Sequence, residues 1–183
     1  MSYPPAETKT IMQKLIERSH IYAQNHAPTM TFSEGKALPE GSMPKVNVII
    51  SCCDPRCLPE EFFMLEKGFE YSIVRNAGGR ANEALRSIIC MDTLLGVQSV
   101  IVVHHTDCGL THLTDTSIRA SLLAKDPSLE SSISNMEFGE ITDIPAAVLE
   151  DVAFLRDSPL IDDSIPIYGC VYDIGSGLVS EVV

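Results

Sequence analysis

Short runs of apolar residues that end in polar clusters recur along the middle of the chain. Residues 45–52, 71–79 and 99–109 each carry β-branched residues into a group of polar residues and glycines. Such apolar runs are typical of strands buried on both faces of a parallel sheet. Residues 82–97, between the second and third runs, have helical periodicity and end near Gly96, as helices often end at glycine. The pattern predicts alternating strands and helices.

The N-terminal flank predicts an amphipathic helix. Residues 7–25 place apolar side chains such as Ile11 and Leu15 at helical spacing. A link rich in proline and glycine follows over residues 27–44. Because this helix stands outside the alternating pattern, we expect residues 1–44 to form a helical arm and link.

The C-terminal part of the chain continues the alternation. Two further helices and a last apolar strand are expected at residues 116–125, 144–157 and 165–183. These elements complete an α/β core over residues 45–183, within one domain that covers residues 1–183. In an open parallel sheet the carboxyl ends of the strands share one edge. The polar residues after Ile50, Val74 and Val103 should therefore converge there.

Composition and charge argue against several classes of partner. The 13 Lys and Arg against 25 Asp and Glu give a net charge of -12, which opposes binding to nucleic acid or to an anionic membrane surface. The sequence has no run of about 20 apolar residues that could span a membrane, and its N-terminus lacks the apolar segment of a signal peptide. We therefore expect a cytoplasmic protein with reduced cysteines that acts on a small molecule.

Metal-binding residue types stand at two of the predicted strand ends. Cys52, Asp54 and Arg56 follow the first strand, and His105 and Cys108 follow the third. Two thiolates and one imidazole suit zinc and leave a fourth position for water, as in catalytic rather than structural sites. The Asp54–Arg56 pair supplies the charges that a metal-bound water needs beside it. A histidine three residues before a cysteine, taken alone, also fits a turn with a core cysteine.

The remaining cysteines and a glycine pair have plainer interpretations. Cys53 and Cys57 lack the C-x-x-C spacing of a redox motif, so we expect them to be inert or to shape the pocket beside Cys52. Cys90 and Cys170 lie within apolar segments and are expected in the core. The glycine pair at residues 78–79 is expected to form a tight turn that lets the backbone approach the site, because no nucleotide-binding pattern follows it.

Four motifs in order resemble those of the β-class carbonic anhydrases. They are Cys52-x-Asp54-x-Arg56, the RNAGG run at residues 75–79, His105-x-x-Cys108-Gly109 and the YDIGSG run at residues 172–177. The short chain is similar to the compact branch of this family, which includes hydrolases of carbonyl sulfide and of carbon disulfide. Pro55 stands where many members have serine, and Cys53 and Cys57 add thiols beside the first motif.

The resemblance implies a zinc enzyme. It assigns one Zn²⁺ per subunit to Cys52, His105 and Cys108, with a zinc-bound hydroxide that attacks the carbon of the substrate. Asp54 is then either an acceptor for the hydrogen bond from zinc-bound water or a fourth ligand in a closed state. Arg56 decides between these roles, since a bidentate pair with Asp54 holds the carboxylate off the metal.

The resemblance also implies a fold and an assembly. Family members have a parallel four-stranded core in the order 2-1-3-4, flanked by helices, with a possible extra strand at the edge. They are dimers with the active sites at the subunit interface. We therefore expect a homodimer with exchanged N-terminal arms, or a higher assembly of such dimers.

The substrate stays open among three small molecules. We expect hydrolysis of carbonyl sulfide to CO₂ and H₂S, because the compact chain and the sulfur-rich, apolar surroundings of Cys52 resemble those hydrolases. The alternatives are reversible hydration of CO₂ to bicarbonate and hydrolysis of carbon disulfide, and a minor one is a non-catalytic zinc or redox-sensing protein.

Two groups of side chains bear on this choice. An apolar wall of the pocket would favour carbonyl sulfide, and the residues after the first strand that could form it also fit packing of the following helix, which is the simpler interpretation. They are Cys53, Pro55, Cys57, Leu58, Phe62, Phe63 and Met64. His104 and His112 are candidate proton shuttles, and each also fits a plain core or surface imidazole.

Overall fold

The computed structural model describes residues 9–39 and 41–183. The chain divides into two compact units, residues 1–39 and 40–183. Within the described residues, no helix has the length and apolar character needed to cross a membrane.

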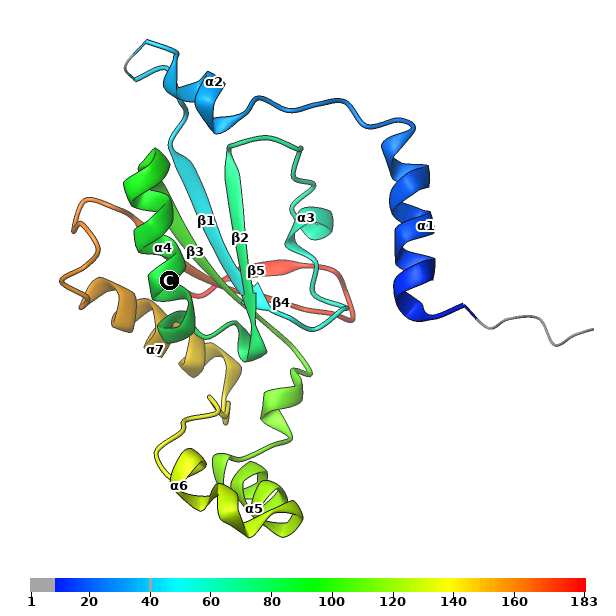
Figure 1. Cartoon of the computed structure of the whole chain (residues 1–183). Helices are drawn as coiled ribbons and strands as arrows, with labels where there is room; N and C mark the ends of the chain where they lie inside the picture. The colour runs from blue at the N-terminus through cyan, green and yellow to red at the C-terminus, as the bar shows by residue number, and fades with distance from the viewer. Residues whose placement is uncertain (1–8, 40) are drawn as a thin grey trace, which may run out of the picture. The chain divides into compact units, whose positions relative to one another are not determined.

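The first unit holds two helices (Figure 1). Helix α1 (Ile11–Ala23) begins after Thr10, and helix α2 (Phe32–Lys36) begins after Thr31. Each threonine accepts the N–H three residues on, and the side chain there bonds back to the threonine N–H, so the first turn is capped. The predicted arm helix is confirmed, although residues 7 and 8 of its expected span lie outside the described residues. The short helix α2 was not predicted.

The second unit is built on a five-stranded sheet (Figure 1). Its strands are β1 (Val46–Cys52), β2 (Tyr71–Asn76), β3 (Val97–His105), β4 (Ile167–Tyr172) and β5 (Val179–Glu181). They lie in the order β2-β1-β3-β4-β5, and all neighbouring pairs are parallel except β4 and β5. The expected order of the first four strands and the extra edge strand are confirmed.

The last apolar segment forms two strands rather than one. After β4 the side chain of Asp173 accepts hydrogen bonds from the backbone N–H and the hydroxyl of Ser176, at 2.7 and 2.8 Å. Gly177 then takes a positive φ of 75°, and the chain reverses into β5. The prediction of a single strand over residues 165–183 is wrong, because aspartate and serine side chains here bond the backbone into a turn.

Two long helices cover one face of the sheet. Helix α4 (Ala81–Leu95) contacts β1 and β2, and helix α7 (Ile144–Arg156) contacts β3 and β4. Their apolar side chains bury Ile50 and Val102 together with the other side chains of that face. The shorter helices are α3 (Pro59–Phe62), α5 (Asp115–Lys125), α6 (Glu130–Ile133), η1 (Ala77–Gly79), η2 (Gly109–Thr111) and η3 (Pro127–Leu129).

The opposite face of the sheet carries a second apolar cluster. Ile49 and Val103 lie in it, with Phe62 and Phe63 from the segment after β1 packed against them. A pocket of about 520 Å³ opens on this face. It is lined by Ile49, Phe63, Leu65, Tyr71, Ile101, Tyr168, Gly169, Cys170, Val179 and Glu181.

Candidate metal centre

The carboxyl ends of β1 and β3 place three metal-binding side chains together. The strands pair with Ser51 opposite Val103, so Cys52 and His105 end at the same edge of the sheet. After β3 the chain turns at Asp107, whose φ is 54°, and returns Cys108 to this edge. The strand ends thus lie together, as the alternation along the sequence predicts.

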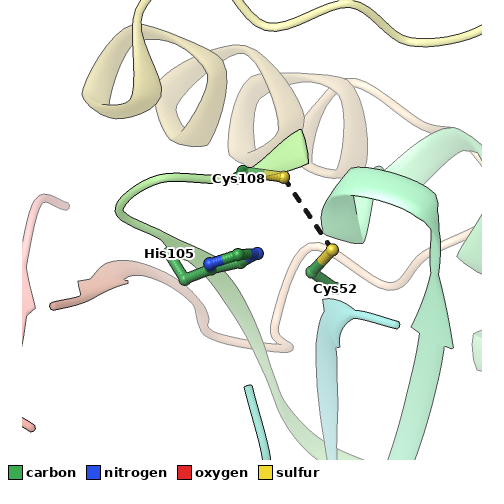
Figure 2. Close-up of side chains that lie close together, drawn as sticks. All are labelled: Cys52, His105 and Cys108. Atoms are coloured by element: carbon green, nitrogen blue, oxygen red, sulfur yellow. Dashed lines mark hydrogen bonds between the residues drawn. The ribbon is translucent and has the colours of Figure 1, made fainter. Parts of the chain in front are cut away.

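Cys52, His105 and Cys108 form a buried cluster (Figure 2). The two Sγ atoms lie 3.9 Å apart, and one potential ligand atom from each residue lies within 4.8 Å of the others. Two sulfurs that each lie about 2.3 Å from one tetrahedral zinc are about 3.8 Å apart. The spacing of the thiols therefore fits a single zinc ion.

His105 presents one ring nitrogen without a protein partner. Its Nδ1 lies 2.9 Å from the carbonyl oxygen of Thr106, and since a carbonyl only accepts, Nδ1 carries the proton. The other nitrogen, Nε2, is buried and has no hydrogen-bond partner among the described residues. A buried imidazole nitrogen is rarely left unpaired, and backbone bonding through the opposite nitrogen is typical of metal-binding histidines. The cluster therefore fits a metal ion by its donor chemistry as well as by its spacing.

The pKa values of the two thiols in the cluster are shifted in opposite directions. The hydrogen bond from Cys108 lowers the pKa of Cys52 well below that of an ordinary thiol, against the effect of burial. The same pairing raises the pKa of Cys108. Burial lowers the pKa of His105, but the neighbouring Cys52 thiolate, the Thr106 carbonyl and Asp54 together outweigh burial and raise it. A bound divalent cation favours the deprotonated form of both thiols and of the ring nitrogen that binds it.

Asp54 faces the cluster from a bidentate pair with Arg56. Nε of Arg56 donates to Oδ1 at 3.0 Å and Nη2 donates to Oδ2 at 2.8 Å, and the backbone N–H of Arg56 adds a bond to Oδ1 at 2.8 Å. These bonds hold the pKa of Asp54 far below its usual range. Oδ2 of Asp54 lies 3.9 Å from Nε2 of His105. The carboxylate is therefore ionised and next to the cluster while still bound to Arg56.

A turn, rather than an extended segment, brings Arg56 to Asp54. β1 ends at Cys52, and the N–H of Cys57 donates to the carbonyl of Asp54 at 3.0 Å. Strand alternation would only place Cys52, Asp54 and Arg56 on one side of an extended chain. That extended geometry is not present beyond Cys52, so the turn at Pro55 is what aligns the pair.

Arg56 also holds the second loop of the site through Asp107. Its Nη1 donates to Oδ2 of Asp107 at 2.8 Å, and its Nη2 donates to the Asp107 carbonyl at 3.0 Å. Asp107 was not predicted as a site residue. The only signal for it is its place between His105 and Cys108, since aspartate is among the residues that tolerate a positive φ.

Arg75 on β2 fixes the backbone of the first loop. Its guanidinium donates to the carbonyls of Cys52, Asp54 and Cys57 at 3.1, 2.6 and 2.9 Å. Arg75 lies in the RNAGG run, but its role was not predicted. Three backbone carbonyls that converge on one side chain leave no pattern in the sequence.

The glycine pair forms the expected close turn. Gly79 has a φ of 71°, and a Cβ built there would lie 3.0 Å from the backbone nitrogen of Cys52. A larger residue would therefore push the turn away from Cys52. A backbone hydrogen bond from Gly78 contributes to the lowered pKa of Cys52.

The two other candidate histidines have different surroundings. His112 is 69% exposed, and its Nε2 lies 3.3 Å from Oδ1 of Asp107. His104 is 1% exposed, and its Nε2 lies 2.9 Å from Oδ2 of Asp151 on α7. Only His112 is therefore open to solvent, as a proton shuttle must be.

The other cysteines are separate from the cluster. All six cysteines are free thiols, as expected. Cys53 is exposed, Cys57 is buried and burial raises its pKa to about 11. Cys170 is buried as predicted. The core prediction for Cys90 is wrong, because its side chain is exposed on α4.

A small pocket of about 220 Å³ opens beside the thiols. It is lined by Cys52, Cys53, Asp54, Ala77, Gly78, Cys108, Gly109, Leu110 and Leu113. Its larger apolar walls are Leu110 and Leu113, and Leu110 also packs against the cluster together with Ile141. Phe62 and Phe63 pack against the sheet and Met64 is 86% exposed, so none of the three lines this pocket.

Comparisons with known proteins point to one family. A family model described as carbonic anhydrase matches residues 47–179. β-Carbonic anhydrase 1 of Mycobacterium tuberculosis is 24% identical over 135 residues, which cover 73% of this chain and 80% of that protein. Carbon disulfide hydrolase of an Acidianus strain is 29% identical over 147 residues, which cover 69% of this chain and 72% of that protein.

A solved structure shows the same fold. The crystal structure of carbonic anhydrase from Streptococcus mutans has a TM-score of 0.80 and 29% sequence identity, and the match covers 96% of this chain and 99% of that one. With the family model matched from β1 into β5, the fold and the relatives lead to one conclusion: this chain belongs to the β-carbonic anhydrase family.

Proposed function

We propose that this protein is a zinc-dependent hydrolase of carbonyl sulfide. Family membership makes it a zinc enzyme of the lyase or hydrolase type that acts on a small molecule. The single observation that carries the choice of carbonyl sulfide is the apolar wall of Leu110 and Leu113 over the two thiols. The sulfur end of carbonyl sulfide is larger and less polar than an oxygen of CO₂, so this wall favours it.

The proposal assigns the metal to Cys52, His105 and Cys108. Zinc, when bound, lowers the pKa of a water molecule from about 15.7 toward about 7 and so supplies a nucleophile at neutral pH. The hydrogen bond from Nδ1 of His105 to Thr106 holds the ring with Nε2 toward the thiols. The hydrogen bond from Cys108 lowers the pKa of Cys52 most, and the N–H groups of Asp54 and Gly78 add to this stabilisation of its thiolate.

Asp54 and Arg56 are the proposed catalytic residues. Asp54 is an ionised acceptor beside the cluster, so it can hold the proton of the attacking water and direct an oxygen lone pair at the substrate carbon. Arg56 keeps both carboxylate oxygens engaged, which favours the open state over direct binding of Asp54 to the metal.

The reaction balances without a further reactant. The water oxygen forms a bond to the carbon of O=C=S, and the resulting thiocarbonate loses its C–S bond. The electron pair of that bond leaves on sulfur, which takes up protons to give H₂S, and CO₂ is the second product.

Hydration of CO₂ is the second candidate, and one observation favours it. Fast CO₂ hydration must pass a proton to solvent, and the exposed imidazole of His112 lies 3.3 Å from Asp107, which is bound to Arg56. Because the Arg56 guanidinium only donates and stays protonated, a proton would reach the exposed His112 through water rather than through Arg56. This arrangement suits a carbonic anhydrase more than a slower hydrolase.

A parallel assay tests the proposal. Purified, zinc-loaded protein is given carbonyl sulfide, carbon disulfide or CO₂, and release of H₂S or of protons gives kcat/KM for each. We expect the highest kcat/KM for carbonyl sulfide. A higher value for CO₂ would support the second candidate, and a higher value for carbon disulfide would match the relative from Acidianus.

We also propose that the protein is a homodimer that exchanges its N-terminal arms. Two features support this. The apolar pocket of about 520 Å³ lies open on the sheet, and α1 exposes apolar side chains, with Ile11 71% exposed and Leu15 49% exposed. Sedimentation of the full chain should give a dimer or a multiple of it, and an Ile11→Glu, Leu15→Glu variant should sediment as a smaller species. A monomeric parent chain would contradict the proposal.

A further inference from the structure

A buried cluster of polar side chains lies behind the metal centre and takes no part in the proposed chemistry. It consists of Arg80, His104 and Asp151, from three different segments of the second unit. Their side chains are 17, 1 and 5% exposed. Burial of polar and ionisable side chains is costly unless they are paired, so the arrangement needs an explanation.

Asp151 is the centre of this cluster. One carboxylate oxygen, Oδ2, lies 2.9 Å from Nε2 of His104 and 3.4 Å from Nε of Arg80. The other, Oδ1, accepts the backbone N–H of Ala81 at 3.0 Å. Ala81 is the first residue of α4, and Arg80 before it offers no side-chain cap. A residue of α7 therefore binds the end of β3 and the start of α4 at once.

Contacts of the Arg80 backbone connect this cluster to the segment of Cys52. Arg80 closes the turn before α4 by exchanging two hydrogen bonds with Asn76, at 2.8 and 2.9 Å. The carbonyl of Asn76 in turn accepts the N–H of Cys53 at 2.8 Å. Between these residues Gly79 packs on the Cys52 backbone, and the N–H of Gly78 stabilises the Cys52 thiolate.

The bond between Asp151 and His104 connects the cluster to His105. His104 and His105 are the last two residues of β3, and their side chains point to opposite sides of the strand. The bond between His104 and Asp151 fixes the strand end from the helix-covered side, while His105 faces the thiols. Displacement of His104 would therefore move the backbone that carries His105.

We propose that Asp151 is a positioning residue for the metal site. Through Arg80, Ala81 and His104 it connects the segment that holds Cys52 to the strand end that holds His105. It touches neither substrate nor metal ligand. The inference rests on the proposed zinc site but not on the choice of substrate. Groups that orient metal ligands from outside typically change metal affinity about 10–100-fold when they are removed.

The test measures zinc affinity by competition with a chelator and the visible spectrum of the Co²⁺-substituted protein. We expect Asp151→Ala to weaken zinc binding about 10–100-fold and to shift the Co²⁺ bands, which report the ligand geometry. Asp151→Asn, which still accepts from Ala81, should recover part of the affinity. A folded Asp151→Ala variant with zinc affinity and Co²⁺ bands like the parent chain would overturn the proposal.

A matched control removes a polar contact from the other end of the same strands. The hydroxyl of Ser99 on β3 donates to Oδ1 of Asn47 on β1 at 2.7 Å. Ser99→Ala should lower the Tm and leave zinc affinity and the Co²⁺ bands unchanged. If Ser99→Ala weakens zinc binding as much as Asp151→Ala does, the effect is general destabilisation and the proposal fails.

Two further outcomes keep the test decisive. If Asp151→Ala does not fold, Arg80→Met removes the ion pair at a less buried position, and it should weaken zinc binding in the same direction by a smaller factor. No change in Arg80→Met would then overturn the proposal. A parent chain that binds no zinc would instead contradict the proposed zinc site itself.

Discussion

The two ends of β1 and β3 are built from the same parallel pairing but differ in their chemistry. At the amino ends, one side-chain hydrogen bond between Asn47 and Ser99 joins otherwise apolar strands. At the carboxyl ends, Cys52 and His105 meet in a cluster with charged groups around it. The strands thus provide one rigid scaffold, and the loops at one end of it provide the chemistry.

The two ends of the strands also differ in how many buried polar atoms lack a hydrogen-bond partner. Among the described residues, the buried side-chain atoms without a partner are Oγ of Ser51, Nη1 of Arg80, Nδ1 of His104 and Nε2 of His105. All four residues lie at the carboxyl ends of the strands or just beyond them. Natural folds leave such atoms unpaired mainly where function requires it. Among the described residues, the unpaired buried side-chain atoms therefore gather at the end of the strands that carries the thiols and His105.

The largest predicted effect comes from removing a thiol of the cluster. Cys52→Ser should lose zinc and all hydrolytic activity, because a hydroxyl is a far weaker zinc ligand than a thiolate. Cys53→Ser should keep one zinc per chain, since Cys53 lies outside the cluster. Metal analysis of both purified variants checks this. Full zinc content in Cys52→Ser would refute the ligand assignment.

The next largest effect is expected on kcat when the proton acceptor Asp54 is removed. Asp54→Asn should retain zinc and lower kcat about 10²–10⁴-fold, the usual range for a lost general base. Arg56→Gln should have a smaller effect on kcat, because Asp54 remains but is no longer held in place. Steady-state kinetics with metal analysis separate these losses from loss of zinc. Unchanged kcat in Asp54→Asn would exclude its catalytic role.

The Asp54–Arg56 pair also predicts that the stability of the fold depends on pH. The folded-state pKa of Asp54 is lowered, so its ionisation stabilises the fold above its unfolded pKa of about 3.9, and this stability is lost as the pH falls through the folded value. Arg56→Gln should therefore lower the Tm at neutral pH, and the difference from the parent should shrink below about pH 4. Thermal melts across this range check it. A constant difference would show that the pair is not the cause.

A smaller effect is expected on substrate choice. Leu110→Ala removes part of the apolar wall beside the thiols, so the ratio of kcat/KM for carbonyl sulfide to that for CO₂ should fall about tenfold, within the range for lost apolar contacts. Leu149→Ala is the matched control, because Leu149 is an exposed leucine on α7. An equal change of the ratio in both variants would exclude a role of the wall.

The smallest effect is expected at the amino end. Asn47→Ala removes the bonds to Ser99 and to the carbonyl of Glu70 and should cost about 1–2 kcal/mol of the free energy of unfolding, with no change of kcat/KM. Denaturant unfolding and the substrate assay measure both. A loss of activity without a loss of stability would mean that the two ends of the strands are coupled.

The sequence predicted the scaffold well because buried strands and helices have strong periodic patterns. The runs that contain Ile50 and Val102 are the central strands, and the order of the strands follows the family resemblance. Elements that depend on local turns were predicted less well. The bonds of Asp173 divide the last apolar segment into β4 and β5, and the exposed position of Cys90 on α4 cannot be read from its apolar neighbours.

By itself, the sequence determined which residue types stand at the strand ends: two cysteines, a histidine and an Asp-x-Arg pair in a fixed order. Only the tertiary structure decided which distant groups hold them in place. Arg75 binds the site from the neighbouring strand β2. Asp107 joins its two loops through Arg56, and Asp151 binds His104 from helix α7. Hydrogen bonds of this kind depend on three-dimensional distance and direction, so they leave no period or spacing along the chain.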